Sequence, residues 1–462
     1  MKKIFLILFS LAFLTACERK IDELSPSANG VNFSNYVAVG NSLTAGYADG
    51  ALYKSGQENS YPNIMATQFR FVGGGDFRQP LISTEEGVGF SLTLTGIYCY
   101  TKHVLKVVPD RDCAGNPVGT YSLKPDFIDP NADQATLQAQ LFAPPVTAGP
   151  YNNMGVAGAQ VQSLFIPGYG SQFGNPFFTR FATSPSTTII QDAMAQQPTF
   201  FSLWIGNNDV LFSALLGTDV LVTPVDTFAK YYTMAVAALM NSGKSPKGVL
   251  MTIPDVSTTP YFNTITTQLP YNGLLLDTAQ AAGLNILYSM YGHPDITFHP
   301  GYNPWVITTT TGEWKQMGPQ DLFLLNLPTD SVKCRGMGVA NPMTLTPYPF
   351  PAQYVLEKSE QDNLNTAVQG YNAVIKQLAD ANGLALADMN AYMKQLIPGL
   401  VFDGIKMNTT FVTGGTFSTD GLHLNPRGNA VVANYIIDAI NAKYGCSVPH
   451  ADVTSYHGLI FP

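Results

Sequence analysis

The sequence predicts an α/β fold with three layers, in which helices cover both faces of a mostly parallel central sheet. Two observations carry this prediction. Short apolar runs rich in β-branched and aromatic residues alternate with longer segments whose apolar residues recur every three or four positions. Each short run also stops at glycine, proline or a polar residue, as a buried strand does. Strands and helices that alternate in this way form a parallel sheet, which carries its chemistry at the carboxyl ends of its strands.

The expected strands follow one another at wide spacing. They lie at residues 36–39, 151–157, 199–205, 248–253 and 384–387. The expected helices fall between and after them, at residues 61–69, 228–239 and 364–378, with a last one that opens at Pro426. Pro62 suits a first helical turn, and Gly383 stands where a helix commonly ends.

Two long segments, residues 73–150 and 261–351, lack this alternation and are rich in glycine, proline and aromatic residues. Unstructured loops of that length are uncommon in a compact domain, so we expect two insertions that lie over the core. Within the second, residues 321–327 read as a strand. The sequence thus predicts one domain over residues 33–445 and a tail at 446–462.

The N-terminus predicts export. Two lysines precede an apolar run at residues 4–13, and small residues lead to Cys17. The run is too short to span a bilayer, and Leu14–Cys17 resembles a bacterial lipobox. We therefore expect a signal peptide over residues 1–16, lipidation of Cys17, a tether over 17–32 and a location at the bacterial envelope, on the outer membrane or cell surface.

Composition excludes some functions and leaves the disulfides open. The net formal charge is −8, with 12% charged residues, and no basic stripe is available to meet a nucleic acid. An exported chain permits two disulfides among the four remaining cysteines, Cys99, Cys113, Cys334 and Cys446. The short loop favours Cys99–Cys113, with Cys334–Cys446 by default. No cysteine spacing suggests a metal site.

Ser42 is the candidate nucleophile. It follows the first expected strand at a sharp strand-to-helix turn, where a hydroxyl faces solvent at the edge of the sheet. A serine also needs a neutral imidazole as base, and that imidazole needs a carboxylate on its other nitrogen. Asp420 and His423, three residues apart before the last helix, supply both. Taken alone, Ser42 is equally compatible with a helix cap, and Asp420 with a capping carboxylate.

Two further residues fit the stabilisation of an oxyanion. Gly158 follows the second expected strand and can bring its N–H close to a substrate oxygen, and Asn208 offers an amide after the third. The alternatives are a packing glycine and an asparagine that bonds its own turn.

Together, four segments resemble the SGNH (GDSL-type) hydrolase family in chain order: Gly40–Leu43, Gly155–Gly158, Gly206–Asp209 and Asp420–His423. The resemblance implies a flavodoxin-like α/β/α fold, Ser42 as nucleophile, and Asp420 and His423 as the rest of a triad. It also implies an oxyanion hole from Ser42, Gly158 and Asn208, with no metal or cofactor. Asn41 stands where the family usually has aspartate, and Gly155 competes with Gly158.

The resemblance implies hydrolysis of carboxylic esters through an acyl-serine. The insertions carry few charged residues, which favours lipid or aliphatic acyl esters. Their aromatic residues also suit stacking on sugars, so a carbohydrate O-acetyl esterase is an alternative. A non-catalytic surface lipoprotein that binds a ligand is another.

Overall fold

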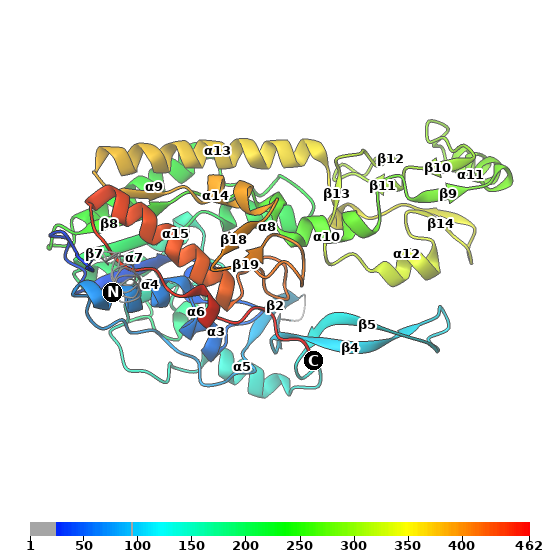
Figure 1. Ribbon diagram of the computed structural model, residues 1–462. Helices are drawn as coiled ribbons and strands as arrows, with labels where there is room; N and C mark the ends of the chain where they lie inside the picture. The colour runs from blue at the N-terminus through cyan, green and yellow to red at the C-terminus, as the bar shows by residue number, and fades with distance from the viewer. Residues whose placement is uncertain (1–24, 94–95) are drawn as a thin grey trace, which may run out of the picture.

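A parallel sheet of five strands forms the centre of the molecule (Figure 1). The computed structural model describes residues 25–93 and 96–462, so the expected leader and Cys17 lie outside the described residues. The strands are β1 (Tyr36–Gly40), β6 (Asn153–Gly155), β7 (Phe200–Trp204), β8 (Lys247–Met251) and β17 (Ala385–Ala387). Their order across the sheet is β17-β8-β7-β1-β6, and every neighbouring pair is parallel. The predicted α/β/α class is therefore confirmed.

The strand order determines where a site can form. Read from β6 to β17, the neighbouring strands are the second, first, third, fourth and fifth of the sheet along the chain. This is the flavodoxin-like order. The direction of winding reverses between β1 and β7. A crevice opens at the carboxyl ends of the two strands at such a point, because their following loops turn to opposite faces.

The sheet is buried on both faces because its strands are apolar throughout. All five residues of β1 are buried, and they alternate between two cores. Val37 and Val39 pack in one core, while Tyr36 and Ala38 pack in the other. An apolar side chain contributes roughly 1.5–3 kcal/mol when it is fully buried in this way.

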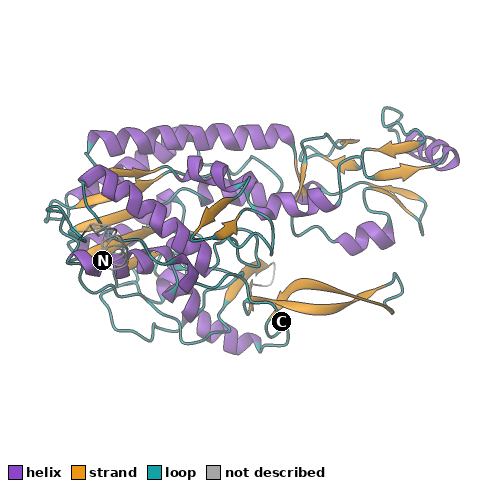
Figure 2. Ribbon diagram, in the orientation of Figure 1, coloured by secondary structure: helices purple, strands orange, loops and turns teal. Residues whose placement is uncertain are grey.

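Helices cover each core (Figure 2). The first core includes α7 (Ile189–Ala195), α9 (Val225–Met240) and α13 (Lys358–Ala381). The second includes α4 (Tyr61–Phe69), α14 (Met389–Leu396) and α15 (Pro426–Tyr444). Asn425 caps α15 by accepting a hydrogen bond from the N–H of Gly428 at 2.9 Å. No helix within residues 25–93 and 96–462 is both long enough and apolar enough to cross a bilayer.

The first insertion consists mainly of two hairpins and a helix. The hairpins pair β2 (Gly89–Thr93) with β3 (Gly96–Tyr100) and β4 (His103–Arg111) with β5 (Pro117–Phe127). The helix α5 (Gln134–Phe142) follows. In Figure 1 the long β4–β5 hairpin projects from the main body on the same side as the second insertion.

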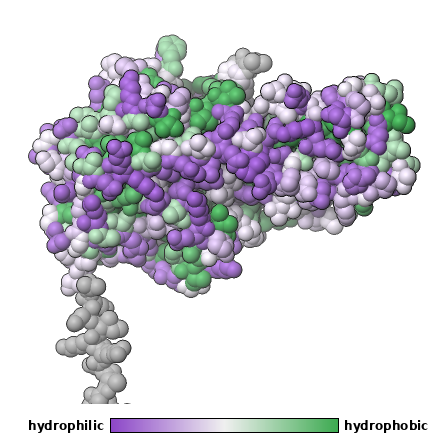
Figure 3. All heavy atoms as spheres, turned by 90° about the horizontal axis from the view of Figure 1, so that it is seen from above, coloured by the Kyte–Doolittle hydropathy of each residue, from purple (hydrophilic) through white to green (hydrophobic). Residues whose placement is uncertain are grey.

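The second insertion holds three helices and several short strands. The helices are α10 (Pro260–Gln268), α11 (Thr278–Met290) and α12 (Thr329–Arg335). The expected strand at 321–327 is reduced to β13 (Leu322–Phe323), which pairs with β16 (Val355–Leu356) and not with the central sheet. Seen from above, the molecule is elongated, with hydrophilic residues over much of the middle of this face and apolar residues in scattered patches (Figure 3).

The predicted disulfide pairing is wrong. Cys113 pairs with Cys334, at a Cα–Cα distance of 5.3 Å and a sequence separation of 221 residues. Cys99 and Cys446 are free and buried. The reason is geometric, because Cys99 packs in a small apolar cluster, whereas Cys113 lies in the turn beyond the long strand β4. That turn lies against α12, where Lys333 Nζ also donates to the carbonyl of Arg111 at 3.2 Å.

Candidate active site

Ser42 begins a four-residue helix at the carboxyl end of β1. The helix α2 (Ser42–Ala45) is capped by Asn41, whose side chain accepts from the N–H of Leu43 at 3.1 Å. The cap is therefore Asn41, and the Ser42 hydroxyl is not used to close the turn. Ser42 is 8% exposed and lines an open cleft.

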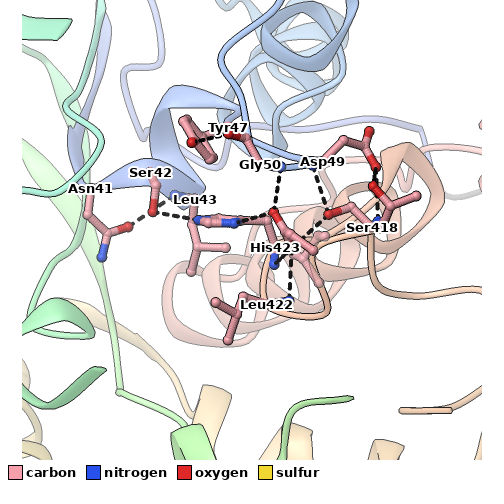
Figure 4. Close-up of polar contacts among 12 residues, drawn as sticks. Asn41, Ser42, Leu43, Tyr47, Asp49, Gly50, Ser418, Leu422 and His423 are labelled. Carbon is pink, nitrogen blue, oxygen red and sulfur yellow. Dashed lines mark hydrogen bonds and ion pairs between the residues drawn. The ribbon is translucent and has the colours of Figure 1, made fainter. Parts of the chain in front are cut away.

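His423 connects Ser42 to Asp420. Its Nε2 lies 2.9 Å from Ser42 Oγ, and its Nδ1 lies 2.8 Å from Asp420 Oδ2 (Figure 4). The loop that carries both residues runs directly into α15, whose capped first turn fixes its end. The structure thus brings together Ser42, His423 and Asp420 in a single hydrogen-bonded chain, with the serine 381 residues from the histidine.

The Asp420 carboxylate accepts hydrogen bonds from several directions. Oδ1 accepts from the N–H groups of Leu422 and His423 at 2.9 and 2.8 Å, and from Ser418 Oγ at 2.9 Å. Oδ2 accepts from the N–H of Gly50 at 3.0 Å. Burial alone would raise the pKa of Asp420, but the adjacent His423 and these donors hold it well below its ordinary value. Asp420 is therefore ionised at any pH at which the protein works.

Asp49 joins the loop that follows Ser42 to the loop that carries Asp420, although nothing in the sequence marked it as a site residue. Its Oδ1 accepts from the N–H and the hydroxyl of Thr419 at 2.9 and 2.7 Å, and its Oδ2 accepts from Tyr53 at 2.6 Å. Its own N–H donates to Ser418 Oγ at 3.0 Å (Figure 4). No motif marks this residue, because the contact joins segments 370 residues apart.

Tyr47 supports the imidazole from the serine side. Its ring centroid lies 5.0 Å from that of His423, and its hydroxyl donates to the carbonyl of Gly50. The ring therefore limits how far His423 can tilt away from Ser42.

Gly158 and Asn208 also line the cleft beside Ser42. Gly158 has φ +81°, a conformation that favours glycine, and a Cβ there would face mainly Asn175 Nδ2 at 3.6 Å. Gly155 lies inside β6, where a Cβ would come within 2.3 Å of the Ala45 nitrogen. Gly155 is therefore a packing glycine, and Gly158 is the glycine at the cleft.

The amide of Asn208 is oriented by the loop that carries Gly158. Asn208 begins α8 (Asn208–Leu215), is 3% exposed, and donates from Nδ2 to the carbonyl of Ala159 at 2.9 Å. Because a primary amide has two N–H groups, this bond leaves the second one for a ligand. Asp209 holds the same loop by accepting from the N–H of Val161 at 3.0 Å. Burial raises the pKa of Asp209 to about 6.

Both insertions contribute to the cleft around Ser42, which has a volume of about 850 Å³. The first insertion supplies Phe90, Tyr100 and His103, and the second supplies Tyr261 and Leu325. A narrow cavity of about 60 Å³ lies on another side of Ser42, and its walls are mostly apolar, including Trp204, Leu211, Met389 and Leu396. The open cleft therefore places the Ser42 side chain among mostly apolar walls.

Metal ligands are not gathered anywhere in the described part of the chain. Within residues 25–93 and 96–462, no group of three or more His, Cys, Asp or Glu side chains is arranged to hold a metal ion.

Comparisons with known proteins identify the family. The model of the GDSL-like lipase/acylhydrolase family matches residues 36–436, whereas no curated protein matches the chain. Among solved structures, a protein described as a GDSL-like lipase from Parabacteroides merdae ATCC 43184 is 12% identical, with a TM-score of 0.34 over 89% of this chain and 96% of that chain. An extracellular lipase from Streptomyces rimosus is 11% identical, with a TM-score of 0.34 over 88% and 99% of the two chains.

The family match starts at β1 and runs into α15, so it includes all five strands of the sheet and the loops that carry Ser42, Asp420 and His423. The chain belongs to the GDSL-like lipase/acylhydrolase family and is a carboxylic ester hydrolase.

Proposed function

We propose that this protein is a serine esterase of the bacterial envelope, anchored through a lipid on Cys17, that hydrolyses aliphatic acyl esters through an acyl-serine intermediate. The observation that carries the proposal is the hydrogen-bonded chain from Asp420 through His423 to Ser42, at the floor of a cleft with mostly apolar walls.

The proposed reaction proceeds in two halves. Ser42 Oγ attacks the ester carbonyl while His423 Nε2 takes its proton, and Asp420 keeps the other ring nitrogen protonated. The negative oxygen that forms accepts from the N–H groups of Ser42 and Gly158 and from the free N–H of Asn208. His423 then gives its proton to the leaving alcohol. In the second half, water attacks the acyl-serine, gives a proton to His423, and releases the acid as Ser42 recovers its proton.

The cleft supports an aliphatic substrate over an acetylated sugar. Its described charged groups are few, with Lys124 and Asp420 among the lining residues, and Asp420 is saturated by internal donors. Sugar hydroxyls need several polar partners, because a buried hydroxyl left without one costs free energy. An aliphatic chain has no such requirement.

The test is a profile of kcat/KM over p-nitrophenyl esters from acetate to palmitate, measured beside acetate release from acetylated xylan. The proposal expects kcat/KM to rise with chain length beyond acetate, and expects an alkyl phosphonate to label Ser42 in a peptide identified by mass spectrometry. A protein that is most active on acetylated xylan would establish the carbohydrate alternative. Failure to label Ser42 would favour a ligand-binding protein.

The anchor needs a test of its own. The Cys17→Ser variant should move from the membrane fraction to the soluble fraction, because the apolar run before it is too short to hold the protein in a bilayer. Ser27→Ala, ten residues further along the expected tether, is the matched control and should stay with the membrane. Mass spectrometry that finds an unmodified Cys17 in the mature wild-type protein would contradict the lipid anchor.

A further inference from the structure

A second groove of about 680 Å³ lies next to the cleft of Ser42. It runs between the β2–β3 hairpin and the loop at residues 166–175, which links the short 3₁₀ turn η2 (Val161–Phe165) to α6 (Pro176–Thr179). Phe90, Leu92 and Asn175 line both the cleft and the groove. The two spaces therefore adjoin along these three residues.

Aromatic side chains form an unbroken wall from the imidazole to this groove. The Tyr47 ring lies 5.0 Å from the His423 ring and 5.8 Å from Phe177, measured between centroids. Phe177 in turn lies 5.5 Å from Phe90, which borders the groove. A substrate chain that leaves the cleft along this wall stays in contact with apolar surface.

The entrance to the groove lies beside the expected oxyanion hole. Asn175 Nδ2 is the atom closest to the position that a Cβ of Gly158 would take, at 3.6 Å. Its amide is already occupied: Nδ2 donates to the carbonyl of Ala157 at 2.8 Å and to Tyr169 OH at 3.0 Å, and Oδ1 accepts from the N–H of Phe177 at 2.9 Å. Asn175 thus presents little free polarity to a passing chain.

Most residues that line the groove are apolar, and several of them are exposed to solvent. Phe173 is 90% exposed, Leu92 78% and Ile166 40%. None of its described lining residues is acidic or basic. Large exposed apolar side chains gathered at a groove mark a binding site, and without charges such a site favours a hydrocarbon over a phosphate or a carboxylate.

We propose that this groove binds the far end of a long aliphatic chain whose ester carbonyl lies at Ser42. The inference rests on the proposed esterase function and adds a second subsite to it. The narrow cavity beside Ser42 is far smaller than the groove, so it suits the short side of the ester.

The experiment compares p-nitrophenyl butyrate with p-nitrophenyl decanoate, both below their critical micelle concentrations, using the full chain. In Phe173→Glu and Ile166→Glu, the ratio of kcat/KM for decanoate to that for butyrate should fall about 15- to 60-fold. One buried methylene contributes about fourfold, so the loss of two or three gives this range. Phe173→Leu should keep most of the wild-type ratio, because it preserves an apolar surface.

Leu275→Glu is the matched control for a charge placed on exposed apolar surface. Leu275 is 62% exposed on β9 (Leu274–Leu276), outside the groove and the cleft. The ratio should be that of the wild type. Since Phe173 and Ile166 are surface residues, circular dichroism melts of these variants should match the wild type.

Three results would overturn the subsite. One is an unchanged ratio in both glutamate variants. Another is a loss seen only with micellar or vesicle-bound substrate, which would assign these residues to a lipid surface. The third is a loss of activity on acetylated xylo-oligosaccharides in the glutamate variants, while their rate on p-nitrophenyl decanoate is retained. If wild-type protein hydrolyses neither p-nitrophenyl ester, or if Ser42→Ala hydrolyses both, the proposed function fails, which is a result distinct from these.

Discussion

Asp420 is held more firmly than Ser42 or His423. It accepts hydrogen bonds from the chain on both of its sides and from Gly50 on the serine loop. Asp49 faces it across the same junction and binds Thr419. The two carboxylates thus hold together the loops that carry Ser42 and Asp420, and the His423 imidazole lies between Ser42 and Asp420, bonded to both. Such fixed groups stabilise a transition state without reorganising during the reaction.

Ser42→Ala tests the nucleophile. We expect kcat/KM on p-nitrophenyl butyrate to fall on the order of 10⁴- to 10⁶-fold, because the acyl-enzyme can no longer form. The melting temperature should stay close to that of the wild type, since the hydroxyl bonds only His423 among the described contacts. A folded variant that keeps a tenth of the activity would rule out Ser42. Ser289→Ala, at an exposed position on α11, is the control.

Asn208→Ala tests the oxyanion hole. The variant should lower kcat by roughly 10²- to 10³-fold with a smaller change in KM, because the amide bonds the transition state more strongly than the substrate. Steady-state kinetics on the best p-nitrophenyl ester separate the two constants. If KM rises while kcat is unchanged, Asn208 binds the substrate and has no part in the oxyanion hole.

Asp49→Asn tests the junction between the two loops. Asparagine keeps one oxygen but has an NH₂ group in place of the other. It therefore cannot accept hydrogen bonds from both Thr419 and Tyr53, as the carboxylate does with its two oxygens. We expect kcat to fall about tenfold or more, with KM nearly constant, because Asp420 and His423 lose their alignment with Ser42. Tyr53→Phe removes only the bond to Oδ2 and should have a much smaller effect. Equal losses in the two variants would contradict this role of Asp49.

The elements that hold the site are β1 and β7, the two parallel strands between which the direction of winding reverses. Ser42 follows β1, and Asn208 opens the helix after β7. Asp209, the next residue, turns inward and fixes the loop of Gly158. The first two residues of α8 therefore have different surroundings, since Asn208 lines the cleft and Asp209 is fully buried, which explains why a buried carboxylate stands beside the site.

The pH dependence of stability tests the buried state of Asp209. Its folded pKa is about 6, above the ordinary value near 3.8, so between those values the folded protein binds the proton that the unfolded chain has lost. The contribution of Asp209 to the free energy of unfolding is largely present at about pH 4 and is lost as the pH rises through about 6. Relative to the wild type, the free energy of unfolding of Asp209→Asn should rise by about 2.5 kcal/mol between pH 4 and 8. Urea unfolding at both pH values measures the difference, and parallel curves would contradict it.

Local signals in the sequence predicted local elements well. The helix at 61–69 has the predicted bounds, and α15 begins at Pro426, because proline in the first turn and a capping asparagine act within a few residues. The strand expected at residues 321–327 is much shorter than predicted, because the extent of β13 depends on its pairing with the distant β16. The site segments were identified as four short blocks, and the structure brings them to one cleft. Asp49 gave no signal, since Thr419, to which it bonds on the other loop, lies 370 residues away.

At the scale of the whole molecule, the two insertions are joined far from the sheet. The hairpin β4–β5 leaves the main body as a two-stranded ribbon, and Cys113 at its turn is bonded to Cys334 on α12 (Figure 1). Isolated two-stranded hairpins are marginally stable in water. The disulfide therefore gives this ribbon a second point of attachment, while residues near its base, such as His103 and Lys124, line the cleft.

Cys113→Ser should loosen the hairpin. We expect limited proteolysis within residues 103–127 to become faster, and the free energy of unfolding to fall by about 2–5 kcal/mol, the usual range for a lost native disulfide. Peptide mapping by mass spectrometry locates the cuts. Cys446→Ser, which leaves the disulfide in place, is the control. Cleavage at the wild-type rate and sites would show that the hairpin is stable by itself.

The distance in sequence between Ser42 and His423 has a consequence for how the protein is made. A ribosome completes the strand before Ser42 early, but it reaches His423 only 381 residues later. For most of its synthesis the growing chain therefore carries a serine with no base, and such a hydroxyl is a poor nucleophile. Any hydrolytic activity waits for residues 420–423 to emerge and for the start of α15 to fold. An unfinished chain therefore holds Ser42 without the imidazole that contacts it in the complete fold.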